Sequence, residues 1–295
     1  MESSALQGSF TALATPFSAD GSKVDFDSLS RLIEHQITNG AHGVVVCGST
    51  GEAATLQESE YKEVVSFSVR EVNQRVPVIA GIGSNDTARA VEMARWLDST
   101  AVDGLLVVAP PYNKPPQRGI IAHFDAVHAV NKRPIVAYNI PGRTGVNILP
   151  ATLAAMFDEG VIAGVKESSG VVDNTLEITA LTGGRLPVLS GEDAQVVALM
   201  ANGAKGVITA TGNVIPETFV NMTRAALSGD FSAARAEQLA ALPVVKAMFS
   251  ETNPIPVKAA LHMIGVISHP TVRLPLVPAE PRTIELLRSV LGAIF

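Results

Sequence analysis

Short apolar segments recur along the chain and predict strands that are buried on both faces. Eight can be delimited: TALATPF (11–17), GVVVCG (43–48), VPVIAGIG (76–83), GLLVVAP (104–110), PIVAYNI (134–140), IAGVKES (162–168), PVLSGED (187–193) and GVITAT (206–211). Valine and isoleucine dominate these segments, and polar residues do not alternate with apolar ones. Parallel strands that helices cover on both sides have this composition.

Between these segments, apolar residues repeat with the spacing of helices that bury one face. Three such stripes are Leu29, Leu32, Ile33 and Ile37; Tyr61, Val64, Val65, Val69 and Val72; and Ala90, Met93, Ala94 and Leu97. Strand and helix together repeat every ~20–33 residues, which leaves room for the crossover between parallel strands. Eight such units fit in about 225 residues, close to the typical size of a TIM barrel. The predicted fold is therefore an α/β (β/α)8 barrel.

The pattern changes after about residue 229. Helical segments over 231–250, 254–267 and 281–294 follow one another without strands between them, and prolines separate them. We therefore predict a catalytic barrel over residues 1–229 and a small C-terminal helical domain over residues 230–295.

Composition and charge narrow the class of protein. The 295 residues are 47% hydrophobic and 17% charged, as in globular chains. A net charge of −6 without a basic cluster argues against nucleic-acid binding. No apolar run approaches the ~20 residues of a membrane span, and the N-terminal stretch lacks a secretory signal pattern. A cytoplasmic protein is expected.

Histidine and cysteine usage predicts neither a disulfide nor a metal site, and no cofactor is expected. Cys47 is the one cysteine and is predicted to be a small core residue. The six histidines form no metal-binding motif. GIGSND (81–86) has Asp86 where a dinucleotide fingerprint needs glycine or alanine. A nucleophile elbow around Ser49 would need glycine at Cys47.

Polar side chains cluster where the predicted strands end, which is where TIM barrels place their active sites. They are Ser49, Thr50 and Glu52; Tyr112, Asn113 and Lys114; Tyr138, Asn139 and Arg143; Lys166 and Glu167; Gly191, Glu192 and Asp193; and Thr209 and Thr211. A lysine partly withdrawn from water has its neutral form favoured, and a neutral amine attacks carbonyl carbons. The resulting imine acidifies the adjacent carbon, and hydroxyl groups can carry its protons. Arginine presents a fork that matches a carboxylate.

Each side chain also has an ordinary structural explanation when it is taken alone. Lys166 could reach solvent past the strand end, Tyr138 could be a core residue, and Arg143 could form a surface ion pair. Ser49 and Thr50 could cap the next helix. Their joint position at one rim of the barrel favours imine chemistry.

Several motifs resemble a known family. GSTGEAATL, PPYNKP, YNIPGRTG, GVKESSG, LSGEDA and ETNPIPVKAAL are similar to those of the N-acetylneuraminate lyase superfamily of pyruvate-dependent class I aldolases. Within it they resemble most the dihydrodipicolinate synthase family, from about Gly8 to Pro278. The resemblance implies a lyase that condenses pyruvate with L-aspartate 4-semialdehyde to give 4-hydroxy-tetrahydrodipicolinate. That reaction begins lysine and diaminopimelate biosynthesis.

The resemblance also implies roles for the residues that perform the chemistry. Lys166 would form the Schiff base with pyruvate, and Tyr138 would donate and accept protons. Ser49 would pass protons between Tyr138 and Tyr112, with Tyr112 supplied by a neighbouring subunit of a homotetramer.

Four further residues would bind the substrates. Thr50 would hold the pyruvate carboxylate, and Ile208 would contact pyruvate through its backbone. Gly191 would lie near pyruvate, and Arg143 would bind the carboxylate of the second substrate.

One position leaves the choice of substrate open. The first hydroxyl of the GSTGE motif is usually threonine in this family, and here it is Ser49, as in sialic-acid lyases. A Schiff-base aldolase for a 2-keto-3-deoxy sugar acid or for N-acetylneuraminate is the alternative. A barrel that only binds ligands is a third, which the intact lysine, tyrosine and hydroxyl set disfavours.

The resemblance bears on regulation as well, because lysine inhibits many members of this family from a cleft between subunits. The positions that hold lysine in sensitive members read Glu58, Tyr61, Arg89 and Pro111 here, with Asn85 retained. Arg89 would repel the ammonium group of lysine, although Glu58 could supply a carboxylate. Weak or absent inhibition by lysine is expected.

Overall fold

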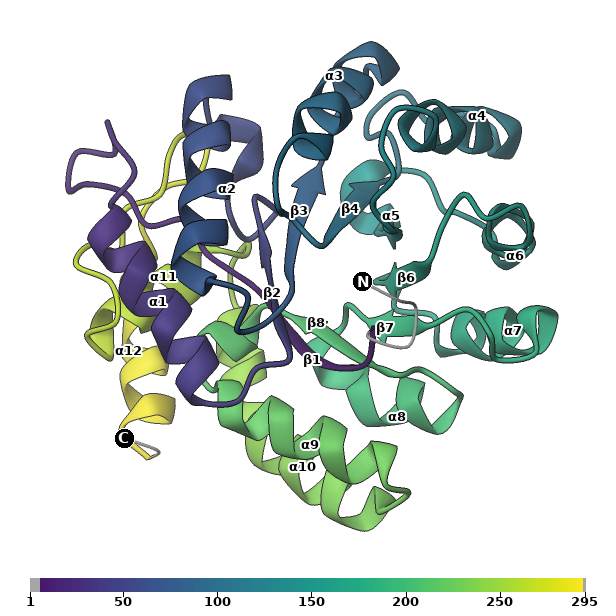
Figure 1. Cartoon of the computed structure of the whole chain (residues 1–295). Helices are drawn as coiled ribbons and strands as arrows, with labels where there is room; N and C mark the ends of the chain where they lie inside the picture. The colour runs from purple at the N-terminus through teal and green to yellow at the C-terminus, as the bar shows by residue number, and fades with distance from the viewer. Residues whose placement is uncertain (1–5, 294–295) are drawn as a thin grey trace.

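Eight parallel strands close into one barrel in the computed structural model, which describes residues 6–293 (Figure 1). The strands are β1 (Gly8–Ala12), β2 (Gly43–Val46), β3 (Val78–Ile82), β4 (Gly104–Val108), β5 (Ile135–Asn139), β6 (Gly164–Glu167), β7 (Val188–Ser190) and β8 (Gly206–Thr209). Each strand pairs with its neighbours in sequence, and β8 pairs with β1. The predicted (β/α)8 barrel is confirmed.

The first strand lies earlier than the apolar run that predicted it. β1 begins at Gly8, where the N–H donates to the Lys205 carbonyl at 2.8 Å. The rest of the run, from Leu13 to Phe17, is buried but leaves the sheet as a loop above the barrel. Burial of a loop produces the same apolar signal as burial of a strand, so the sequence pattern misplaced β1.

Helices surround the barrel and bury the faces that their sequences predict (Figure 1). They are α1 (Phe26–Thr38), α2 (Glu58–Val72), α3 (Thr87–Asp98), α4 (Gln117–His128), α5 (Pro141–Thr144), α6 (Pro150–Asp158), α7 (Val172–Thr182), α8 (Val196–Ala201) and α9 (Pro216–Leu227). On α1, Leu29, Leu32 and Ile33 are buried, and Asp25 caps the helix by accepting the Ser28 N–H at 3.0 Å. Short 3₁₀ turns η2 (Ala53–Thr55), η3 (Asp193–Gln195) and η4 (Thr211–Asn213) follow β2, β7 and β8.

Three helices follow the barrel, as predicted: α10 (Phe231–Met248), α11 (Ile255–Met263) and α12 (Pro281–Leu291). Figure 1 shows α10 alongside α9, and their residues share one apolar core. Val245 and Val257 belong to the same buried cluster as Leu32 and Val165 of the barrel layers. The division into domains at residues 229 and 230 stays a prediction, because the C-terminal helices and the barrel are packed together.

Membrane-spanning helices and metal sites can be looked for directly in the structure. Within the described chain, no helix combines the length and apolarity that crossing a membrane requires. In the same residues, no three histidine, cysteine or acidic side chains are grouped as metal ligands.

Candidate active site

Lys166 and Tyr138 lie side by side at the ends of neighbouring strands. They face each other in the register between β6 and β5, and each residue is 6% exposed. The Lys166 Nζ atom lies 4.3 Å from the centroid of the Tyr138 ring. None of the ion pairs within residues 6–293 involves Lys166. The amine is therefore withdrawn from water and faces an aromatic ring.

Most of the predicted site residues line one small cavity of about 60 Å³. A cavity needs about 10–15 Å³ in the same measure to hold one water molecule, so this one has room for several waters or for a small keto acid. Seven predicted residues line it: Ser49, Thr50, Tyr138, Arg143, Lys166, Gly191 and Ile208. They come from β5, β6 and β8, from the loops after β2 and β7, and from α5, so closure of the barrel brings them together.

Tyr112 is the predicted residue that the cavity does not include. Its side chain is 85% exposed, and its backbone has a φ of 72°, in the left-handed region that disfavours bulky residues. Its N–H donates to the Thr144 carbonyl at 3.0 Å, which fixes the turn. The side chain therefore does not line the cavity of its own chain.

The turn after β2 presents the hydroxyl group of Thr50 to the cavity. Thr50 Oγ1 accepts a hydrogen bond from Asn253 Nδ2 at 2.9 Å. Because a hydroxyl has one donor and two acceptor positions, its proton stays free to bond to a carboxylate. The Gly51 carbonyl accepts from Thr15 Oγ1 at 2.7 Å and anchors the turn to the loop after β1.

Arg143 lies on α5, where the small cavity meets a wider one of about 360 Å³. Its Nη2 atom donates to the Asn253 carbonyl at 2.9 Å. In the described part of the chain, Arg143 forms no ion pair with a carboxylate. Its guanidinium group is exposed and has donors left for an anion that enters from the wider cavity.

Gly191 leaves space that the lysine side chain needs. A Cβ atom at this position would lie 2.9 Å from Lys166 Cε and 1.7 Å from Ser168 Oγ. Any larger residue would therefore displace the Ser168 side chain and crowd Lys166 Cε. Gly191 therefore leaves room for Ser168 and Lys166, and its proximity to the substrate stays a prediction.

Two residues that line the cavity, Glu192 and Asn253, have no role in the sequence analysis. Burial raises the pKa of Glu192 to about 7; the neighbouring Asp193 and Glu167 carboxylates add to the rise, and Lys166 opposes it. Glu192 follows the end of β7, and this strand-end position could have identified it as a site residue. Asn253 lies in the ETNPIPVKAAL motif, which was the signal for it, but its place beside the cavity depends on how the C-terminal part of the chain packs.

Cys47 is a buried core residue, as predicted. Its side chain is 2% exposed, and burial raises the pKa of its thiol far above the usual range. A thiol in this state is a poor nucleophile.

Comparison with known proteins decides the family. A model of the dihydrodipicolinate synthetase family matches residues 5–294. The chain belongs to this family. It is 44% identical over 285 residues to 4-hydroxy-tetrahydrodipicolinate synthase of Geobacter metallireducens, covering 97% of both chains.

Solved structures of the same family share the fold. Dihydrodipicolinate synthase of Thermotoga maritima superposes with a TM-score of 0.94 at 38% identity, covering 97% of this chain and 98% of that one. A monomeric dihydrodipicolinate synthase variant gives a TM-score of 0.95 at 38% identity, covering 98% and 97%. This dihydrodipicolinate synthetase family member therefore has the fold of its relatives along nearly all of its length.

The structure shows the contacts of three residues at the positions that the resemblance connects with lysine inhibition. Glu58 forms an ion pair with Lys62, which lowers the pKa of Glu58 and partly neutralises its charge. Tyr61 is buried and donates to the Gly81 carbonyl at 2.9 Å. Arg89 is exposed on α3. Weak or absent inhibition by lysine stays a prediction. The argument against this prediction is that Glu58 could bind the ammonium group of lysine, and the ion pair of Glu58 with Lys62 weakens that argument.

The raised pKa of Glu192 predicts a dependence of stability on pH. The folded state binds this proton more tightly than the unfolded state does, so between about pH 4.5 and 7 stability falls as pH rises. The full shift corresponds to about 3 kcal/mol, and solvent screening of a partly exposed group reduces this to roughly 1–2 kcal/mol. Glu192→Gln should match the wild type near pH 4.5 and be more stable by that amount at pH 8.

Urea unfolding at fixed protein concentration measures this difference. Glu63→Gln, which changes an exposed carboxylate on α2, is the matched control and should show no pH-dependent gain. Equal stability of Glu192→Gln and wild type at pH 8 would show that Glu192 is ordinarily solvated.

Proposed function

We propose that this lyase condenses pyruvate with L-aspartate 4-semialdehyde to give 4-hydroxy-tetrahydrodipicolinate, the first committed step of lysine and diaminopimelate biosynthesis. The observation that carries the proposal is the Lys166 amine, 4.3 Å from the Tyr138 ring centroid in a small cavity at the barrel rim. Family membership supports the choice of substrates. We retain the expectation that the enzyme acts in the cytoplasm.

Catalysis begins with an imine between the enzyme and pyruvate. The unprotonated Lys166 amine adds to the C2 carbonyl carbon, and the loss of one water molecule leaves a C=N bond. The Thr50 hydroxyl group donates a hydrogen bond to the pyruvate carboxylate, and the backbone of Ile208 borders the bound keto acid. Gly191 leaves room for Lys166 beside it.

Carbon–carbon bond formation follows from the acidity of C3 in the imine. Tyr138 removes the C3 proton to give an enamine, and in the proposed relay it exchanges this proton with solvent through Ser49 and Tyr112. The enamine carbon attacks the aldehyde carbon of the semialdehyde, and the new alkoxide takes up a proton to become a hydroxyl group. The amino group of the semialdehyde then attacks C2, closes the ring and releases the Lys166 amine.

Arg143 orients the second substrate. Its guanidinium group lies where the two cavities meet and has no carboxylate partner within residues 6–293. A semialdehyde carboxylate bound there would direct the aldehyde carbon toward Lys166. A charge-assisted contact of this kind contributes about 1.5–3 kcal/mol.

Tyr112 acts on the site of a neighbouring subunit in the proposed homotetramer. An 85% exposed tyrosine in a left-handed conformation costs its own chain about 1–3 kcal/mol of backbone strain and gains no contact with its own cavity. Such strain is typical of residues that are positioned for a function. The structurally similar dihydrodipicolinate synthase variant is monomeric, so a single chain can adopt this fold without partner subunits.

A turnover assay tests the proposed substrates. Pyruvate with aspartate semialdehyde should give product at a rate far above the rates of N-acetylneuraminate and 2-keto-3-deoxygluconate cleavage. The Arg143 fork favours a short substrate that ends in a carboxylate. Faster cleavage of either sugar acid would replace the proposed function with the sugar-acid alternative.

Borohydride trapping tests the imine directly. Treatment of the wild type with pyruvate and borohydride should add one reduced pyruvyl group per chain, located by peptide mass spectrometry on Lys166. Lys166→Ala should gain none, whereas Lys114→Ala, which changes an exposed lysine near the barrel mouth, should be labelled fully. A wild-type chain that stays unmodified would contradict imine catalysis.

Subunit mixing tests the role of Tyr112. Tyr112→Phe and Lys166→Ala should each be nearly inactive, and exchange of their subunits should restore activity because each mixed pair builds one complete site. Random pairing predicts about a quarter of wild-type activity. Native mass spectrometry can confirm the hybrids. If they form without activity, Tyr112 acts within its own chain.

A further inference from the structure

A buried ion pair joins the C-terminal helices to the rim of the barrel. Lys258 Nζ on α11 lies 2.6 Å from Glu52 Oε1, and the two side chains are 0% and 2% exposed. Every other ion pair within residues 6–293 has at least 15% of each side chain exposed. Because removing two charges from water offsets most of their attraction, such a pair is a poor source of stability.

Glu52 is part of the turn that carries Ser49 and Thr50. Its N–H donates to the Ser49 carbonyl at 3.1 Å, and its backbone has a φ of 51°, a conformation that non-glycine residues seldom adopt. Its second oxygen, Oε2, accepts a hydrogen bond from the backbone N–H of Arg273 at 2.9 Å. Both oxygens of this carboxylate are therefore held by the C-terminal part of the chain.

The same part of the chain contacts the turn a second time. Asn253, five positions before Lys258, donates from Nδ2 to Thr50 Oγ1 at 2.9 Å. The Glu52 and Thr50 contacts together fix both the backbone of the turn and the hydroxyl group that faces the cavity.

The charged state of Lys258 depends on Glu52. Burial lowers the pKa of the Lys258 ammonium group, and the Glu52 carboxylate opposes this fall. The ammonium group also lies 4.0 Å from the centroid of the Phe17 ring. Loss of either charge would leave its partner buried without an opposite charge, which favours movement of the turn toward water.

We propose that Lys258 is a positioning residue that acts through Glu52 and sets the geometry with which the turn at Ser49 and Thr50 binds the carboxylate of the keto acid. The C-terminal helices thereby control the affinity of the site for its first substrate, without touching that substrate. This inference rests on the proposed function, because it takes pyruvate to be the occupant of the cavity.

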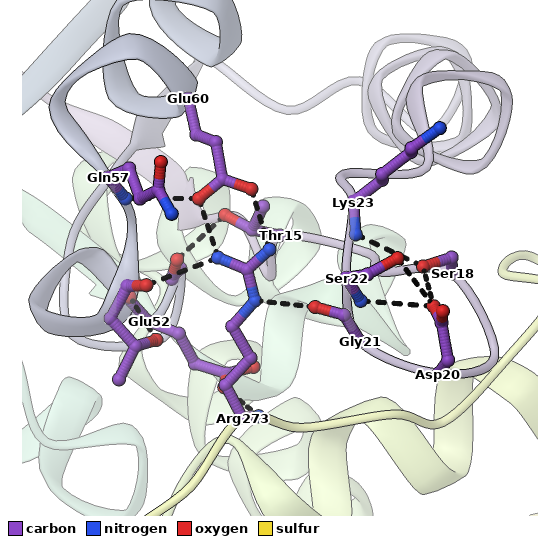
Figure 2. A network of polar contacts seen from close by, with 12 residues as sticks. Thr15, Ser18, Asp20, Gly21, Ser22, Lys23, Glu52, Gln57, Glu60 and Arg273 are labelled. Atoms are coloured by element: carbon purple, nitrogen blue, oxygen red, sulfur yellow. Dashed lines mark hydrogen bonds and ion pairs between the residues drawn. The ribbon is translucent and has the colours of Figure 1, made fainter.

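A second ion pair provides a matched control. The Arg273 guanidinium group binds both oxygens of Glu60 at 2.6 Å, and Figure 2 shows it between Glu60 and the Gly21 carbonyl. This pair also joins the C-terminal part of the chain to the barrel, but through the start of α2. Arg273 also contacts Glu52 through its backbone N–H and the Thr55 carbonyl through Nη1, and Glu60→Gln removes neither contact. Because the Lys258–Glu52 pair stays intact in Glu60→Gln, this variant should weaken the attachment and leave the turn in place.

The test compares Lys258→Met, Glu52→Gln and Glu60→Gln with the wild type. Lys258→Met should raise the KM for pyruvate by about tenfold or more, while kcat and the KM for the semialdehyde change less than about threefold. Glu52→Gln, which keeps size and an acceptor oxygen, should raise the KM for pyruvate by about three- to tenfold. Glu60→Gln should leave it within about twofold of wild type.

Borohydride trapping gives a second readout that does not need the semialdehyde. The pyruvate concentration for half-maximal labelling should rise in parallel with KM, and it does not depend on the fraction of folded protein. If Lys258→Met does not fold, Glu52→Gln decides alone. A pyruvate KM within twofold of wild type in every folded variant of the pair, or a loss confined to kcat, would overturn the inference. An unlabelled wild type would instead refute the proposed function itself.

Discussion

Parallel closure of the barrel is the constraint on which the site depends. Because all eight strands run in one direction and pair in order, their carboxyl ends meet at one rim. The register that aligns Tyr138 with Lys166 then places a phenol ring against an amine. No loop has to fold back to bring them together, so the reactive pair is as rigid as the sheet.

The surroundings of the amine exclude water, and within the described residues no carboxylate forms a direct ion pair with it. Lys166 has a ring at one side and the bare backbone of Gly191 at another. The carboxyl group that shares the cavity, Glu192, changes its charge near neutral pH because of its own burial. The titratable carboxyl group of Glu192 and the Lys166 amine therefore share one cavity, and the charge of the amine changes as the imine forms. The fixed charge of Arg143 stays at the outer end, where the second substrate enters.

Local sequence patterns predicted the barrel, its order of elements and most of the cavity, because strand ends converge in this fold. Lys166, Tyr138 and the turn at Ser49 needed only the apolar runs before them and the polar residues after them. The same reasoning misplaced β1, because a buried loop is as apolar as a strand. It assigned no role to Asn253 or Lys258, although both lie in the ETNPIPVKAAL motif, because their contacts with the rim span about 200 positions of sequence. Such contacts are decided by how helices pack, which no local pattern contains.

A crystal structure of the protein soaked with pyruvate tests the central claim most directly. The account predicts continuous electron density between Lys166 Nζ and C2 of the keto acid. It also predicts that the carboxylate lies against the Thr50 hydroxyl, with the methyl carbon toward Tyr138. Pyruvate bound without a covalent bond, or with its carboxylate on Arg143 and its carbonyl away from Lys166, would contradict the account.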